Sequence, residues 1–181
     1  MIDKYSMRNC IVTNIGGYGV LHAQNTTAVV ADVSITASTF NTITDAFVFL
    51  NTKSNSVVVS ECTFYNCLGN GRYIFNFNNN VANVPTVFKF ENNIVGKFYY
   101  TAATPDPTHS ARATNPKIVE AFALGSYKTS DFVVNTGYPL SGVSEYERAS
   151  ADLFVDPANG NFRIKDANFS GASNAGDPRW R

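Results

Sequence analysis

Carboxylate side chains are sparse between residues 7 and 97, and this limits the chemistry that the region could perform. The acidic residues there are Asp32, Asp45, Glu61 and Glu91. Hydrolysis of a glycosidic bond by paired carboxyl groups needs two acids close together, and a Ca²⁺ site needs several oxygen ligands. No pair of acids recurs at a constant spacing, so we expect no metal site and no hydrolase of this type.

Two cations, Arg72 and Lys97, are the candidates for a catalytic base and its partner. The cations of the region are Arg8, Lys53, Arg72, Lys89 and Lys97. A base that abstracts a proton beside a uronate carboxylate needs a pKa lowered by burial or by neighbouring cations. The sequence shows no such neighbour for Arg72 or Lys97, so we favour solvated cations at strand edges.

The two histidines, His22 and His109, do not indicate a nucleophilic triad. They lie far apart in the chain, and no serine or cysteine motif accompanies them. His22 belongs to an alternating run and reads as a surface or half-buried strand residue. His109 lies in a stretch rich in proline and threonine, where a long surface loop is expected.

Aromatic and amide side chains favour sugar binding over proton abstraction. Aromatic rings stack on sugar rings, and amide groups form hydrogen bonds with hydroxyl groups. The candidate glycan-binding residues are Tyr99, Tyr100, His109, Asn76 and Asn78. Shallow sites of this kind bind weakly, so we expect weak glycan binding.

Two alternating runs, residues 45–51 and 72–78, carry further aromatic rings. Alternation places Phe47 and Phe49 on one face of a strand, and Tyr73, Phe75 and Phe77 on one face of the next. An outward face would build an aromatic strip for sugars, whereas an inward face would be core. Core is the favoured interpretation.

An eight-residue repeat predicts the elements that position these residues. It occurs as MRNCIVTN (7–14), ITASTFNT (35–42), VSECTFYN (59–66) and FENNIVGK (90–97), with a degenerate copy at YKTSDFVV (127–134). Its first and sixth positions are apolar. Its fourth position is small or polar and forms the column Cys10, Ser38, Cys62 and Asn93. A motif that recurs at intervals of 20 to 50 residues indicates stacked repeats.

The repeat predicts an all-β fold, a right-handed parallel β-helix of four to five coils with a C-terminal hairpin cap. The column would form a ladder at one bend of successive coils. Four β-arcs of a non-solenoid sheet are the alternative. We expect coils over residues 1–135 with a long loop at about 98–117, and a capping segment over residues 136–181. In that segment DLFVDPANGNFRIK (152–165) indicates a hairpin, and Trp180 is expected to pack over the last coil.

Composition excludes several classes of partner. The chain has 14 basic and 14 acidic residues, so its formal net charge is zero, which argues against a nucleic-acid partner. No apolar run is long enough to span a membrane. The start shows no apolar signal core and begins almost inside the first repeat, so we expect a fragment of a longer protein. Cys10 and Cys62 would lie two coils apart, about 9.6 Å, too far for a disulfide.

The NC and NN bends, FVDPANGNFRIKD (154–166) and the closing GDPRW (176–180) resemble the C-terminal region of pectate-lyase-like β-helix proteins. Those proteins belong to the polysaccharide-utilisation systems of Bacteroidetes. The resemblance implies a right-handed β-helix that is secreted or at the cell surface, in the outer membrane or periplasm, with a polysaccharide partner of the pectin type. It does not imply an activity.

The expected function is a polysaccharide-binding or scaffold module that is non-catalytic in isolation and uses no cofactor. The alternative is part of a polysaccharide lyase that acts on a uronate-containing glycan, with Arg72 and Lys97 as catalytic candidates. Ca²⁺ would enter only with that alternative.

Overall fold

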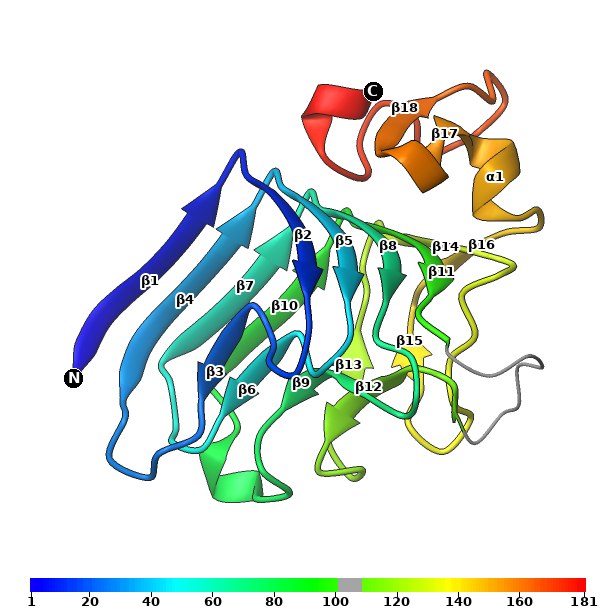
Figure 1. The fold of residues 1–181 in the computed structure, drawn as a ribbon. Helices are drawn as coiled ribbons and strands as arrows, with labels where there is room; N and C mark the ends of the chain where they lie inside the picture. The colour runs from blue at the N-terminus through cyan, green and yellow to red at the C-terminus, as the bar shows by residue number, and fades with distance from the viewer. Residues whose placement is uncertain (101–108) are drawn as a thin grey trace.

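The computed structural model describes residues 1–100 and 109–181 and shows a right-handed parallel β-helix (Figure 1). Three parallel sheets build this part of the chain. Sheet A contains β1 (Ile2–Arg8), β4 (Val30–Thr36), β7 (Ser56–Ser60) and β10 (Val87–Glu91). Sheet B contains β2 (Ile11–Ile15), β5 (Thr39–Ile43), β8 (Thr63–Cys67), β11 (Ile94–Phe98), β14 (Tyr127–Thr129) and β16 (Ser144–Tyr146). Sheet C contains β3 (Leu21–Ala23), β6 (Val48–Leu50), β9 (Tyr73–Asn76) and β12 (Arg112–Asn115).

Each turn of the solenoid supplies one strand to each sheet from β1 to β12. Shorter strands continue it, because β13 (Ala121–Phe122) pairs in parallel with β15 (Leu140–Ser141), and β14 pairs with β11 and β16. The parallel pairing therefore extends to Tyr146. The prediction of an all-β parallel β-helix is confirmed, and the alternative of a non-solenoid sheet is excluded.

The register confirms the eight-residue repeat. Its first positions are direct partners in sheet A, as are its sixth positions in sheet B. The two columns are Met7, Ile35, Val59 and Phe90, and Val12, Phe40, Phe64 and Val95. Both columns point into the solenoid, where Phe40, Phe64 and Phe90 are almost fully buried and their rings stack across turns. Burial of one large apolar side chain per turn drives the stacking.

Backbone geometry explains why the motif is eight residues long. The third and eighth positions of the first four copies have positive φ, a conformation that non-glycine residues adopt only at a cost. At the third position the angles are 56° at Asn9, 47° at Ala37, 54° at Glu61 and 54° at Asn92. At the eighth they are 58° at Asn14, 62° at Thr42, 55° at Asn66 and 28° at Lys97. These two positions bend the chain into and out of sheet B.

The predicted ladder forms at the first of these bends. The Cys10 N–H donates to Ser38 Oγ at 3.1 Å, and the Cys62 N–H donates to Asn93 Oδ1 at 2.8 Å. The Asn93 N–H in turn donates to Ser126 Oγ at 3.0 Å. The fifth rung is therefore Ser126. The register predicted for the copy at 127–134 is wrong by four residues, since it would have placed Ser130 in the column.

The C-terminal segment, residues 150–181, folds back along the outside of sheet B. It contains α1 (Ser150–Leu153), β17 (Phe154–Asp156), η3 (Pro157–Asn159), β18 (Asn161–Ile164) and η4 (Pro178–Trp180). β17 and β18 pair antiparallel, which confirms the predicted hairpin. Its apolar side chains form a second, smaller core with Ile94, and the segment runs above the bends of sheets A and B in Figure 1.

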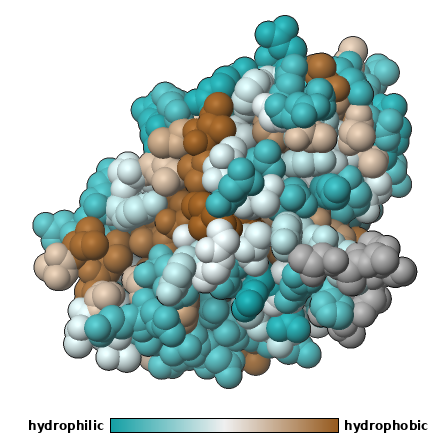
Figure 2. Space-filling model, viewed as in Figure 1, coloured by the Kyte–Doolittle hydropathy of each residue, from teal (hydrophilic) through white to brown (hydrophobic). Residues whose placement is uncertain are grey.

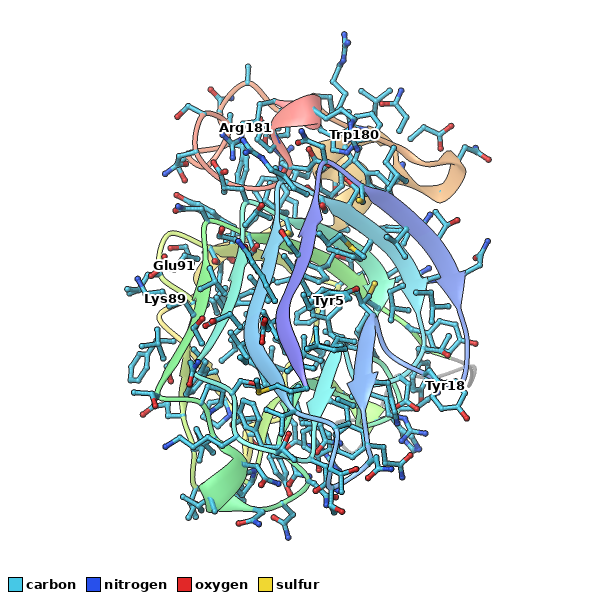
Figure 3. All side chains as sticks on the ribbon, turned by 90° about the vertical axis from the view of Figure 1, so that its left-hand side faces the viewer. Tyr5, Tyr18, Lys89, Glu91, Trp180 and Arg181 are labelled. Carbon is cyan, nitrogen blue, oxygen red and sulfur yellow. The ribbon has the colours of Figure 1, made fainter. Side chains whose placement is uncertain are left out.

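The prediction that Trp180 packs over the last coil is wrong. Its Nε1–H donates to Thr39 Oγ1 at 2.7 Å, in the second turn, and Arg179 reaches the Asn9 carbonyl in the first. Figure 3 shows Trp180 and Arg181 above the first turns. The segment binds here because Thr39 and Thr63 point outward from sheet B and offer hydroxyl groups to a passing chain.

Asp177 is the centre of this attachment. Its carboxylate is 2 % exposed, accepts a hydrogen bond from Thr39 Oγ1 at 2.7 Å and pairs with Arg179 at 3.1 Å. The Asp177 N–H donates to Thr63 Oγ1 at 2.9 Å. The preceding Gly176 has φ of +77°, and a Cβ there would lie 2.8 Å from Ile94 Cδ1. The GDPRW motif is thus explained by close packing on sheet B.

Candidate functional site

Sheet C has an irregular alternation that decides which side chains face outward. In β9, Ile74 and Phe75 are consecutive and both buried in the main core, whereas Tyr73 and Asn76 on either side are partly exposed. β12 repeats the pattern, with Arg112 paired to Tyr73 and Asn115 paired to Asn76. β9 and β12 therefore each present two outward positions separated by two inward ones.

This irregularity corrects the predicted aromatic faces. Phe47, Phe75 and Phe77 are fully buried and contact other core rings, so the favoured interpretation as core is right for them. Phe49 is not on their side. It is buried as well, at 8 % exposed, but it lies on the opposite side of β6, pairs with Asn76 and His22, and contacts the His22 ring. Tyr73 also faces outward, because strict alternation fails between it and Phe75.

The first outward row, here called the amide–aromatic row, consists of Tyr18, His22, Phe49, Asn76 and Asn115. The Tyr18 and His22 ring centroids are 4.9 Å apart, and those of His22 and Phe49 are 4.7 Å apart, both edge to face. Tyr18 is 62 % exposed, and Figure 3 shows it outside the ring of strands while Tyr5 lies inside. The row thus begins with an accessible aromatic ring.

The amide half of the row keeps part of its hydrogen-bonding capacity. Asn76 Oδ1 accepts from Asn115 Nδ2 at 3.0 Å and from the Asn78 N–H at 2.9 Å. Asn78 Nδ2 donates to Asn51 Oδ1 at 2.7 Å, and this bond connects the turn of β9 to the preceding turn. These bonds fix the side chains. Within residues 1–100 and 109–181, the Asn76 amide protons and Asn115 Oδ1 have no hydrogen-bond partner, so both could bind a ligand. Both predicted asparagines therefore belong to this face.

The second outward row, here called the cation–aromatic cluster, consists of Tyr73, Arg112, Lys117 and Tyr138. Arg112 Nη1 donates to the Tyr73 hydroxyl at 2.9 Å, and its Cζ lies 5.4 Å and 4.8 Å from the Tyr73 and Tyr138 ring centroids. Lys117 Nζ lies 5.7 Å from the Tyr138 centroid. In Figure 2 the lower part of the view, around sheet C, is mostly hydrophilic, whereas apolar surface gathers over the first turn.

The remaining predicted glycan-binding residues lie elsewhere, after β11. The Tyr100 ring packs against the main core and lies 5.9 Å from the His109 ring, so the structure does bring these two residues together. The Tyr99 N–H donates to the Cys67 carbonyl, and its side chain is partly exposed. The middle of the predicted loop, residues 101–108, lies outside the described residues, and the end of that loop forms β12.

The two catalytic candidates occupy different sheets. Arg72 precedes β9 in sheet C, and its Nε lies 3.5 Å from Asp45 Oδ1. The guanidinium is thus engaged in an ion pair with a carboxylate. Lys97 is exposed in β11 of sheet B, where its N–H donates to Thr129 Oγ1. Its place in the repeat is explained by the bend at the eighth position.

Sequence reasoning missed Tyr18, Arg112, Lys117 and Tyr138. Arg112 and Lys117 follow a stretch rich in proline and threonine, which carries no strand pattern before β12. Tyr138 reaches Tyr73 from a segment 65 residues later in the chain, since 138 − 73 = 65. The one local signal was the glycine-rich stretch NIGGYG around Tyr18, which predicts a turn at the surface.

The cysteines and acids do not build a reactive centre in the described ranges 1–100 and 109–181. Cys10, Cys62 and Cys67 are free thiols, and burial raises the pKa of Cys62 and of Cys67 to about 12. A thiol held protonated in this way is a poor nucleophile. No group of three or more His, Cys, Asp or Glu side chains in these ranges could hold a metal ion, and no helix there is long and apolar enough to cross a membrane.

Comparison with known proteins places the chain in a family without assigning an activity. No curated protein and no solved structure matches the chain. A family model described as a domain of unknown function, DUF5123, matches residues 57–180, from the third turn to the end of the GDPRW motif. The match covers the ladder from Cys62 to Ser126, the hairpin and Asp177, and the chain therefore belongs to the DUF5123 family.

Proposed function

We propose that the protein is a glycan-binding β-helix module and that the glycan lies along the outer face of sheet C. The observation that carries the proposal is the amide–aromatic row, where an exposed Tyr18 ring leads to fixed asparagine amides with unused donors and acceptors. Aromatic rings bind the apolar face of a sugar, and amides bind its hydroxyl groups.

The stacking of the solenoid suits an extended ligand. Successive rungs of a parallel sheet are about 4.8 Å apart, so His22, Asn76 and Asn115 lie on one line along the solenoid, with the buried Phe49 between His22 and Asn76. A chain of sugar residues laid along this line would meet several turns at once. Many weak contacts along one line favour a polysaccharide over a small molecule.

The module is proposed to act without catalysis and outside the cytoplasm. Support for a non-catalytic role comes from Arg72, which is paired with Asp45, and from Lys97, which lies on a different sheet. The extracytoplasmic location and the pectin-type partner rest on the resemblance to pectate-lyase-like proteins. Tyr99, Tyr100 and His109 would form a secondary contact after β11.

Binding to immobilised glycans tests the proposal. We expect the protein to bind neutral or acidic plant-type oligosaccharides weakly, and Tyr18→Ala or Asn76→Ala to reduce that affinity about tenfold. Phe122→Ala is the matched control, because Phe122 is 55 % exposed on β13, outside sheet C. Unchanged binding in both sheet C variants, with loss in Tyr99→Ala/Tyr100→Ala, would move the site to the region after β11.

A lyase that acts on uronate-containing glycan is the alternative, and it predicts a different readout. Incubation with pectin and with glycosaminoglycan would then produce unsaturated sugars that absorb ultraviolet light. We expect no such product. Turnover that disappears in Arg72→Ala or Lys97→Ala would establish the lyase and reverse the proposal.

A further inference from the structure

The cation–aromatic cluster contains two positive charges without a carboxylate partner. The ion pairs of the described residues include neither Arg112 nor Lys117. The nearest cationic neighbour in sequence to Tyr73, Arg72, already uses Asp45. Two like charges beside one tyrosine ring repel each other unless an anion lies between or near them. Both cations contact the Tyr138 ring, so an anionic ligand bound there would be attracted by two positive charges.

The Arg112 guanidinium is held in place before any ligand arrives. Two tyrosine rings flank it, and the Tyr73 hydroxyl accepts its Nη1–H at 2.9 Å. Its Nε is buried and has no hydrogen-bond partner, so the group is partly removed from water. A guanidinium fixed in this way loses little conformational entropy when it binds an oxyanion.

Gly71 lies beside the guanidinium, where a side chain would crowd it. A Cβ added to Gly71 would lie 3.3 Å from Arg112 Cζ and 3.3 Å from its Nη2, and the Gly71 φ of +73° also disfavours a side chain. Any larger residue there would cover the guanidinium. Lys117 is exposed and stands over the Tyr138 ring, so its ammonium group can move toward a bound anion.

We propose that this cluster binds the oxyanion group of an acidic sugar residue, a carboxylate or a sulfate ester. The inference rests on the proposed function, because the same outer face of sheet C would carry the rest of the glycan along the amide–aromatic row. Arg112 would supply the directional hydrogen bonds, Lys117 a screened charge, and the tyrosine rings the stacking surface. The cluster would thus select acidic glycans over neutral ones.

Calorimetric titration of the full chain tests this selectivity. The probes are a neutral, a carboxylated and a sulfated oligosaccharide of equal length, and inorganic sulfate alone. We expect the acidic probes to bind about tenfold more tightly than the neutral one, and their affinity to fall as salt rises. The site would be supported if inorganic sulfate displaced the acidic probes but did not displace the neutral probe. The ratio of the two acidic affinities identifies the carboxylate or the sulfate as the preferred group.

Two variants separate a binding role from a structural one. Lys117→Ala removes an exposed cation. It is expected to lower the affinity for the acidic probes about threefold and to leave the affinity for the neutral probe unchanged. Arg112→Lys keeps the charge but removes the parallel N–H donors of the guanidinium, and it is expected to weaken binding of the acidic probes about tenfold. Lys165→Ala, an exposed lysine of the C-terminal segment, is the matched control.

The outcomes distinguish this inference from the proposed function. Equal affinity for neutral and acidic probes, or no effect in Lys117→Ala and Arg112→Lys, would overturn the oxyanion site and leave the glycan proposal standing. Binding of inorganic sulfate that depends on Arg112, with no oligosaccharide bound, would overturn the glycan proposal and leave a free-anion site.

Discussion

At the scale of single residues, the ladder satisfies polar groups that are buried at the first bend of each turn. Ser38 and Asn93 are fully buried, and both accept backbone N–H groups from a neighbouring turn. Cys62 and Cys67 are buried beside carbonyl groups of Ile35 and Phe40, where a thiol is a weak donor and a thiolate would be repelled. Protonation of these thiols is therefore coupled to folding.

We predict that the protein loses stability as the pH rises above 9. Burial raises the pKa of Cys62 and Cys67 from 9.0 to about 12, so between these values the unfolded chain releases protons that the folded chain keeps. Proton release then favours unfolding, by about 1.4 kcal/mol per pH unit for each thiol. Burial also raises the pKa of Tyr5, Tyr65 and Tyr146, which adds to the loss above pH 10.

Urea unfolding at pH 8, 9.5 and 10.5 measures this loss. Cys67→Ala should reduce the pH slope by about half, whereas Cys10→Ala, at a partly exposed thiol, is the control. A free energy of unfolding that is constant over this range would contradict the prediction.

At the scale of the elements, each turn depends on one residue that accepts positive φ before sheet B. Asparagine and glycine adopt this conformation at small cost, and they occupy it as Asn9, Asn92 and Gly125. Ala37 and Glu61 occupy the same position without that advantage, at φ of 47° and 54°. The bends of the second and third turns are therefore strained relative to the others.

We predict that Ala37→Gly stabilises the protein by about 1 kcal/mol, since glycine removes the strain of a left-handed alanine. The midpoint of thermal or urea unfolding should rise. Ala113→Gly is the matched control, because Ala113 is buried in β12 with ordinary strand geometry, and this change should destabilise by about 1 kcal/mol. A loss of stability in Ala37→Gly would show that the bend carries no such strain.

At the scale of the whole molecule, the C-terminal segment joins turns that a solenoid would otherwise connect only to their neighbours. Arg179 reaches Asn9, Asp177 reaches Thr39 and Thr63, and the Gly176 N–H donates to the Asn92 carbonyl. The Phe169 ring contacts Tyr127 in a later turn. Stacked repeats can unfold one after another, so these lateral contacts should make unfolding more cooperative.

We predict that Asp177→Ala lowers the free energy of unfolding by about 3 kcal/mol, because it removes a buried, charged hydrogen-bond acceptor from Thr39 and Arg179. Hydrogen exchange should show β1 and β2 opening before the later turns, whereas the unaltered protein should open as one unit. Asp3→Ala, at an exposed carboxylate, is the control. Uniform exchange across all turns in Asp177→Ala would contradict the role of the segment.

The repeat, the ladder and the parallel solenoid could be predicted from the sequence because their causes are local. One apolar residue per strand, one small residue per bend and the hairpin signal at Asp156 to Gly160 each act within a few residues, and stacking repeats them. Alternation was less reliable in sheet C, where the consecutive inward residues Ile74 and Phe75 leave Tyr73 on the outer face.

Tertiary structure alone decided the candidate site and the path of the C-terminal segment. Arg112 meets Tyr138, and Trp180 meets Thr39, only after separate turns have stacked, and the latter pair is 141 positions apart in sequence. Such contacts depend on which turns become neighbours and on which surfaces remain uncovered. A local sequence pattern does not show which turns become neighbours or which surfaces stay exposed. The sequence by itself therefore determined the solenoid, and the tertiary structure determined which side chains meet on its outer faces.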